Sequence, residues 1–136
     1  MKRRRLHQVV FAGAAIYNVG WGLLTTLHPE WLFDAVGMEP MRYPEIFACL
    51  GMVIGLYGLL YLQVARDPER GWWIAAVGFV GKLLGPVGMG WAVATGDWPW
   101  EALLYLNLTN DFVWLPFFAL YLWDARSYVG RPSRGM

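Results

Sequence analysis

Four long apolar runs constrain the fold of this chain more than any other feature. They cover approximately residues 9–27, 45–64, 72–95 and 101–123. A helix needs about 20 apolar residues to cross the ~30 Å hydrocarbon core of a bilayer, and each run matches or approaches that length. Because lipid offers no partner to an unpaired backbone group, all four runs are expected to be helical. The sequence therefore predicts an all-α fold, a four-helix transmembrane bundle.

The distribution of charge supports this interpretation and predicts an orientation. Only 15% of the 136 residues are charged, against about 25% in soluble domains. One side of the membrane receives nine of the eleven Lys and Arg residues, whereas Arg42 lies on the other side and Lys82 within a span. The nine are Lys2, Arg3, Arg4, Arg5, Arg66, Arg70, Arg126, Arg131 and Arg134. The positive-inside rule then puts both termini in the cytoplasm, with the chain a multi-pass protein of the bacterial inner membrane.

Little of the chain remains outside these runs, so we expect residues 1–136 to form a single integral membrane domain. The basic start resembles that of a signal peptide, but the apolar run after it is longer than a 7–15-residue h-region, so we expect it to stay as the first span. The outer connection 28–44 is too long for a tight turn. Pro29, followed by acidic residues, indicates a short helix that lies at the membrane surface and ends near Gly37, with a plain surface loop as the alternative.

Glycines recur along the second and third runs at spacings that place them largely on one helix face. They are Gly51, Gly55 and Gly58 in the second run, and Gly78, Gly81, Gly85 and Gly88 in the third. In membranes, small residues on one face let helix backbones approach closely. We therefore expect both faces to be packing surfaces, within the bundle or in a homodimer.

Two charged residues, Lys82 and Asp111, lie near the middle of membrane-spanning runs. A charge at the bilayer centre costs roughly 2.5–3.5 kcal/mol on insertion scales, so it usually has a partner or a function. Lys82 is nine residues beyond Trp73 and Asp111 is eleven beyond Trp100, which puts them about 14 and 16 Å deep from opposite faces. Since Asn18 also falls mid-span, we predict a polar site at the midplane.

The fourth run provides most of the polar side chains of this predicted site. Asn107, Asn110, Asp111 and Trp114 have i, i+3, i+4 and i+7 spacing, which is one face of an α-helix. Asp111 can accept a proton or cation, Lys82 can tune it or bind an anionic group, and the amides can hydrogen-bond a ligand. The candidate ligand-binding residues are Asn18, Trp21, Lys82, Trp91, Asn107, Asn110, Asp111 and Trp114, with His28 and Glu45 as further candidates.

Several function classes lack any signal in the sequence. HExxH, GxSxG and P-loop motifs are absent. The single Cys49 excludes an internal disulfide, and His7 and His28 lie at opposite ends of a span, where they cannot share a metal or haem. We therefore expect no metal and no cofactor. The net charge of +1, without a basic and aromatic patch, indicates no nucleic-acid partner.

The first half of the chain resembles the DoxX-like group of small four-span bacterial membrane proteins. The resemblance rests on Gly20 to Pro29 at the end of the first run, on Glu45-Ile46-Phe47 at the start of a Gly-rich second run, and on Leu59-Leu60 near its end. Members of this group are linked to redox or oxidative-stress complexes. The resemblance therefore implies a membrane partner and no catalytic residues.

Three functions remain open at this point. The first is binding or transport of a small amphiphilic or cationic solute, in which Asp111 and Lys82 are the working pair. The second is a membrane-embedded isomerase or cyclase acting on a lipid or isoprenoid, in which Asp111 moves protons and the rings of Trp91, Tyr105 and Trp114 stabilise a cation. The third is an accessory subunit of a membrane redox complex, in which the charged pair only sets helix register.

Overall fold

The computed structural model of the chain describes residues 1–129, and all of its regular elements are helices. Their bounds are α1 Arg4–Leu27, α2 Trp31–Val36, α3 Pro44–Arg66, α4 Trp72–Ala94, α5 Trp100–Leu103, the π-helix η1 Leu104–Phe112, α6 Leu115–Ala125 and the 3₁₀-helix η2 Arg126–Tyr128. Arg131 and Arg134, which count toward the predicted orientation, lie outside the described residues.

The predicted four-helix transmembrane bundle is confirmed. Four helical stretches are long and apolar enough to cross a membrane, and they begin at Arg4, Pro44, Trp72 and Trp100. Their outer faces expose large apolar side chains that suit contact with lipid, for example Ile16, which is 75% exposed. The protein is therefore a multi-pass membrane protein. The first helix starts five residues before the apolar run near residue 9, because hydropathy marks the lipid-facing part of a helix and not its first hydrogen bond.

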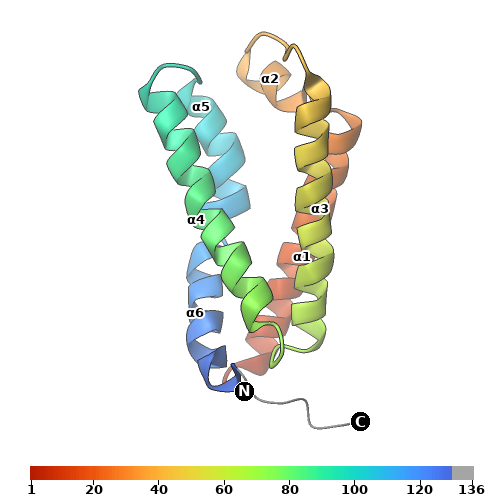
Figure 1. Cartoon of the computed structure of the whole chain (residues 1–136), viewed down its shortest axis with the longest axis vertical. Coiled ribbons are helices and arrows are strands. Elements are labelled where there is room, and N and C mark those ends of the chain that lie inside the picture. The colour runs from red at the N-terminus through yellow and green to blue at the C-terminus, as the bar shows by residue number, and fades with distance from the viewer. Residues whose placement is uncertain (130–136) are drawn as a thin grey trace.

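The long helices form two pairs, which Figure 1 shows side by side. One pair is α1 with α3; the other is α4 with the chain of α5, η1 and α6. The pairs meet at the end of the bundle that holds the N-terminus, here called the terminal end. They diverge toward the opposite end, which carries α2 and is here called the α2 end.

Helices α1 and α3 are in close backbone contact along much of their length. A Cβ added to Gly22 would lie 2.6 Å from the carbonyl oxygen of Gly51 and 2.7 Å from the Cα of Gly55. A Cβ on Gly58 would lie 2.8 Å from the carbonyl oxygen of Ala15. Only glycine fits at such positions, so these residues determine the spacing of the pair, as the glycines of the second run predict.

Within the single chain, most glycines of α4 do not make the close backbone approach that their spacing suggests, and packing in a homodimer stays a prediction. Within 4 Å, a Cβ on Gly81 or Gly88 would meet no atom of the described chain outside its own helix backbone. The atoms nearest to a Cβ on Gly78 belong to the side chain of Tyr61, and those nearest to a Cβ on Gly85 belong to the side chains of Asp111 and Asn107. These glycines make room for side chains and for open space, and they bring no two backbones together.

The fourth membrane span is not one regular α-helix. Its middle, Leu104–Phe112, is a nine-residue π-helix, and α6 starts anew at Leu115. Pro116 occupies the first turn of α6, where its missing N–H costs nothing. In a continuous α-helix this N–H would bond the Phe112 carbonyl, so the proline favours a break at this point.

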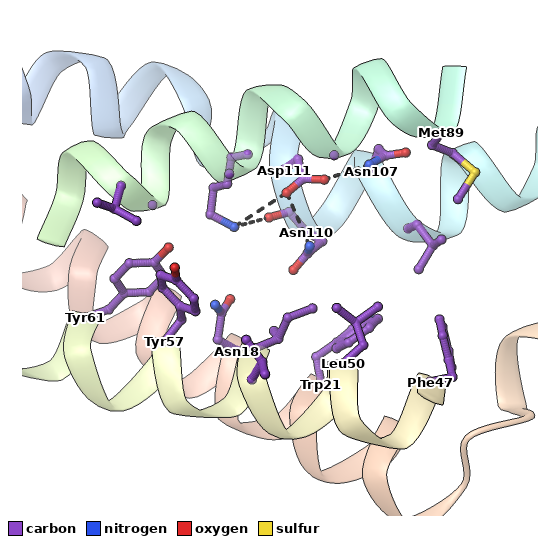
Figure 2. Close-up of a pocket in the computed structure, with 18 residues that line it drawn as sticks. Asn18, Trp21, Phe47, Leu50, Tyr57, Tyr61, Met89, Asn107, Asn110 and Asp111 are labelled. Atoms are coloured by element: carbon purple, nitrogen blue, oxygen red, sulfur yellow. Dashed lines mark hydrogen bonds and ion pairs between the residues drawn. The ribbon is translucent and has the colours of Figure 1, made fainter. Parts of the chain in front are cut away.

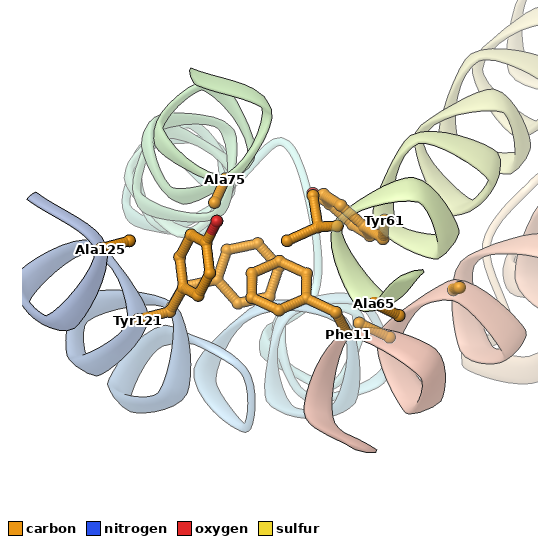
Figure 3. Packing of buried hydrophobic residues seen from close by; sticks show 10 residues of the cluster. Phe11, Tyr61, Ala65, Ala75, Tyr121 and Ala125 are labelled. Carbon is orange, nitrogen blue, oxygen red and sulfur yellow. The ribbon is translucent and has the colours of Figure 1, made fainter. Parts of the chain in front are cut away.

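An aromatic core joins the two pairs at the terminal end (Figure 3). The rings of Phe11 and Phe118 have centroids 4.6 Å apart, and those of Tyr61 and Phe118 are 5.1 Å apart. Phe118 therefore connects α6 to both α1 and α3. Tyr121 adds a hydrogen bond from its hydroxyl to the Pro68 carbonyl oxygen at 2.7 Å.

Polar contacts reinforce the same end. Arg3 donates two hydrogen bonds to the carboxylate of Asp124, at 2.8 and 2.7 Å. The buried His7 places its Nε2 2.9 Å from Oδ2 of the same carboxylate. These contacts tie the start of α1 to the end of α6.

The predicted surface helix is also present, as the six-residue α2. It starts at Trp31, two residues after Pro29, and it ends at Gly37 in the left-handed conformation with φ 69°. Its own residues Leu32 and Phe33 are buried. The ring of Phe33 lies 5.4 Å from that of Trp98, in the turn before α5, so this aromatic contact links the two pairs at the α2 end.

Candidate functional site

A cavity of about 380 Å³ lies between the two helix pairs (Figure 2). This volume falls within the range of about 300–1,000 Å³ that small-molecule sites occupy. Helices α1, α3, α4 and η1 all contribute to its wall. The lining residues are Asn18, Trp21, Phe47, Leu50, Val53, Ile54, Tyr57, Tyr61, Val77, Gly78, Gly81, Lys82, Gly85, Met89, Leu106, Asn107, Asn110 and Asp111.

The only charged residues in this lining are Lys82 and Asp111, which form the ion pair expected from the sequence. The Lys82 Nζ lies 3.8 Å from the Asp111 Oδ1, and both residues are buried. Lys82 also donates a hydrogen bond to the backbone carbonyl of Asn110. The ammonium group therefore has a second partner on the same helical segment, which offsets part of the cost of burying it.

Two amides hold the carboxylate of Asp111 on its other sides. The Nδ2 of Asn107 donates to Oδ2 at 2.7 Å, and the Nδ2 of Asn110 donates to Oδ1 at 3.2 Å. A carboxylate can only accept, so these bonds fix the orientation of both amides. The amide oxygens are consequently left to face other groups.

The helix geometry explains how these side chains come together. Gly85 lies opposite Asp111, where an added Cβ would be 3.0 Å from Oδ2, so a larger residue would crowd the carboxylate. Pro86 follows, within the continuous helix α4, and its missing N–H frees the carbonyl of Lys82. The π-helical turns of η1 are wider than α-helical turns, and such segments are frequent at functional sites.

The structure places six of the candidate residues around this cavity. Their polar or aromatic side chains come from α1, α4 and η1. In Figure 2 the labelled side chains of α1 lie across the gap from those of η1. The six are Asn18, Trp21, Lys82, Asn107, Asn110 and Asp111.

The other four candidates lie outside the cavity lining. Trp91 is 72% exposed on the outer face of α4. Trp114 packs against α1, with its ring 3.5 Å from the position of a Cβ on Gly13. A π-helix turns less per residue than an α-helix, so residue 114 no longer lies above Asn107 as the i+7 spacing predicts. His28 and Glu45 are both exposed.

Sequence reasoning missed the aromatic and apolar part of the wall. Tyr57 and Tyr61 of α3 line the cavity on its side nearer the terminal end, while Phe47 and Met89 line the side nearer the α2 end. The i, i+4 spacing of the two tyrosines places them on one face and was an available signal. Apolar residues such as Phe47 cannot be told from lipid-facing ones by hydropathy.

The chemistry available in the cavity is hydrogen bonding and contact with an apolar molecule. Along residues 1–129, no three His, Cys, Asp or Glu side chains come together in a way that could hold a metal ion. The ion pair can exchange or share a proton, and the amides can bind donors.

Comparison of the sequence with protein-family models and with curated proteins, and of the fold with solved structures, finds no match. The site is therefore interpreted from its own geometry.

Proposed function

We propose that this protein binds a small amphiphilic or cationic solute in the cavity between its helix pairs, and that it serves as a membrane binding or transport protein. One observation carries the proposal: a buried ion pair, Lys82 with Asp111, lies in the wall of a cavity that is otherwise largely apolar. Ionisable groups inside a membrane commonly mark a substrate or ion pathway. Transport would use a second copy of the chain to complete a path across the bilayer.

A purely structural ion pair is the competing explanation, and it corresponds to an accessory subunit of a membrane complex. The hydrogen bond from Lys82 to the Asn110 carbonyl favours it, because this contact satisfies the ammonium without any ligand. The DoxX-like resemblance of the first half also points toward a partner subunit. A lipid isomerase or cyclase has less support, since Trp91 and Tyr105 are exposed and lie away from the cavity lining.

The deciding experiment combines stability with ligand analysis. Wild type, Asp111→Asn, Lys82→Met and the double variant are purified in mild detergent, unfolded thermally, and extracted for mass spectrometry of bound molecules. If the site binds a ligand, the variants fold and lose a molecule that the wild type carries. Proteoliposome flux of that molecule, abolished by Asp111→Asn, then separates transport from binding.

A structural pair gives a different pattern. Each single variant strands a buried charge, which costs about 3–5 kcal/mol, and the double variant recovers. Finding this pattern with no bound molecule would reject a ligand site. The matched control is Asp67→Asn with Arg70→Met. The Asp67–Arg70 pair has a 3.3 Å contact, but its side chains are 45% and 66% exposed, so its loss should change stability little.

We also propose that the terminal end faces the cytoplasm of a bacterial cell. The basic residues of this end, including Arg3 and Arg4 before and at the start of α1, support this orientation by the positive-inside rule. Reporter fusions test it: a fluorescent protein joined to the C-terminus should fold, and a periplasmic phosphatase joined there should be inactive. Activity of the phosphatase fusion would reverse the orientation.

A further inference from the structure

The cavity wall contains every buried side-chain polar atom that lacks a hydrogen-bond partner within the described chain. These atoms are Asn18 Oδ1, Trp21 Nε1, Asn107 Oδ1 and Asn110 Oδ1. Buried polar groups are normally paired, and a cluster of unpaired ones requires an explanation. Here they gather in one cavity from two facing helix pairs, which indicates that a ligand supplies their partners.

The orientation of two of these amides is not arbitrary. Asn107 and Asn110 both use their Nδ2 to bond Asp111, so each presents its oxygen as a free acceptor. A ligand that satisfies both oxygens must bring hydrogen-bond donors. The indole N–H of Trp21 adds a donor, so a group that both donates and accepts suits the set. A hydroxyl meets this requirement.

The charge of the wall favours an uncharged head group. Lys82 and Asp111 carry opposite charges and lie 3.8 Å apart, so the lining has no net charge. A cation beside this pair would be attracted by Asp111 and repelled by Lys82, so that the two effects offset each other in part. Neither an ammonium nor a phosphate head would therefore receive the counter-charge that burial in a membrane requires.

The remaining wall suits an apolar chain that comes from the bilayer. Phe47 and Met89 lie on the side of the polar residues nearer the α2 end (Figure 2). Leu50 and Val53 of α3 and Val77 of α4 line the cavity and are 45%, 50% and 53% exposed. The cavity is therefore accessible along the gap between α3 and α4.

Two side-chain contacts bridge the opposite side of the cavity, between α1 and the fourth span. The hydroxyl of Tyr17 lies 2.7 Å from the Thr109 Oγ1, and the ring of Trp114 packs beside Tyr17 with a centroid distance of 5.9 Å. The exposed lining residues of the α3–α4 gap, by contrast, favour this gap as the route to the polar groups.

We propose that the ligand is an uncharged, hydroxyl-bearing amphiphile with an apolar chain, which reaches the cavity laterally from the bilayer between α3 and α4. The inference rests on the proposed function and narrows it to one head-group chemistry. The hydroxyls bond the oxygens of Asn107 and Asn110 and the amide of Asn18, and the chain extends along the α2-end wall past Phe47.

The test uses three probes with the same twelve-carbon chain: monododecanoylglycerol, dodecyltrimethylammonium and dodecyl phosphate. Each is titrated into the full chain in phosphatidylcholine nanodiscs, and the rise in the midpoint of thermal unfolding yields an apparent Kd. We expect monododecanoylglycerol to bind at least about tenfold more tightly than either charged probe, because one unpaired buried charge outweighs the gain from two hydroxyl contacts.

Asn18→Leu is the informative variant. The described chain offers no partner to the Asn18 Oδ1, so the change should not lower the unfolding midpoint of the probe-free protein. It should weaken monododecanoylglycerol binding about two- to tenfold, the effect of one hydrogen bond. Gln63→Leu, an exposed position outside the cavity, is the matched control and should leave binding unchanged.

Gly81→Leu provides a second variant that fills the cavity. A Cβ at Gly81 meets no atom within 4 Å outside its own helix backbone, so the protein should fold, and the larger side chain should abolish binding of the probe.

Three results would overturn the inference. Equal or tighter binding of a charged probe, lost in Gly81→Leu, would reject the uncharged head but leave the proposed binding function intact. Monododecanoylglycerol binding that persists in Gly81→Leu would place that lipid elsewhere on the protein. Absence of any shift in the unfolding midpoint with monododecanoylglycerol would reject the uncharged, hydroxyl-bearing head group. The proposed binding function is decided separately, by the Asp111 and Lys82 variants and by the molecule extracted from the wild type.

Discussion

The two helix pairs use glycine in opposite ways, and this difference explains where the cavity lies. Between α1 and α3, Gly22 and Gly58 bring the two backbones into close contact. Along α4, Gly81 and Gly88 touch no neighbouring element within 4 Å, and Gly85 accommodates the carboxylate of Asp111. The same residue type thus closes one interface and keeps the other open.

The comparison indicates a division of roles. The α1–α3 pair is closely packed, and its helix α1 contributes Asn18 and Trp21 to the cavity wall. The α4 pair contains the π-helix, the ion pair and Pro86, which are all departures from regular helix packing. We therefore expect variants of the glycines that bring α1 and α3 together to change stability, and variants of α4 near Asp111 to change ligand binding.

The largest effect should come from the aromatic core that joins the pairs. Phe118→Ala removes the ring that contacts Phe11 and Tyr61 and should cost about 3–5 kcal/mol of unfolding free energy, since it leaves a cavity in a closed core. Denaturant titration in mixed micelles measures this loss. Phe117→Ala is the matched control, because its ring is 38% exposed. Equal losses for the two variants would show that Phe118 does not join the pairs.

A smaller effect should follow from Gly22→Ala. Its Cβ would lie 2.6 Å from a carbonyl oxygen of α3, so the helices must separate, at a cost of about 1–3 kcal/mol. Gly88→Ala makes the same change where no neighbouring element lies within 4 Å, and higher helix propensity should stabilise it by up to about 1 kcal/mol. Thermal unfolding compares the two. A Gly22→Ala protein as stable as Gly88→Ala would contradict the close packing of α1 with α3.

The smallest change in stability, but a distinct change in binding, is expected for Gly85→Ala. The new methyl group would lie 3.0 Å from Asp111 Oδ2 and should displace the carboxylate from Asn107, while stability stays within about 1 kcal/mol of wild type. Infrared bands of the carboxylate and the amount of co-purified ligand report the shift. Gly81→Ala, where an added Cβ meets no neighbour within 4 Å, should change neither. Identical spectra for Gly85→Ala and wild type would mean that Gly85 does not position Asp111.

Much of the fold could be predicted from the order of residues along the chain. Run length and hydropathy predict the four spans, because the bilayer imposes a single length and demands internal hydrogen bonds. The short helix α2 follows from Pro29 and Gly37. The polar residues of the cavity wall could also be found, because Lys82 and Asp111 are exceptional in apolar runs.

The π-helix could not be predicted, and with it the position of Trp114 was missed. The four-residue spacing from Asn107 to Asp111 is compatible with an α-helix. Hydropathy is the same whether the turns of a helix are α-helical or π-helical. The contribution of Tyr57, Tyr61 and Phe47 to the cavity wall was missed for a related reason. In a membrane protein, an apolar residue has the same hydropathy whether it faces lipid, another helix or a cavity. Only the packing of the helices distinguishes the three environments.

The sequence by itself therefore determined that the chain is a bundle of four membrane helices with charge at its centre, because the bilayer penalises any other arrangement of these residues. Only the tertiary structure decided which glycines close an interface and which leave a space, since that depends on the residues opposite them. It also decided that Asn18 and Trp21 face Lys82 and Asp111 across one cavity while Trp91 faces outward. Those choices depend on how two helix pairs diverge, and no local pattern encodes that angle.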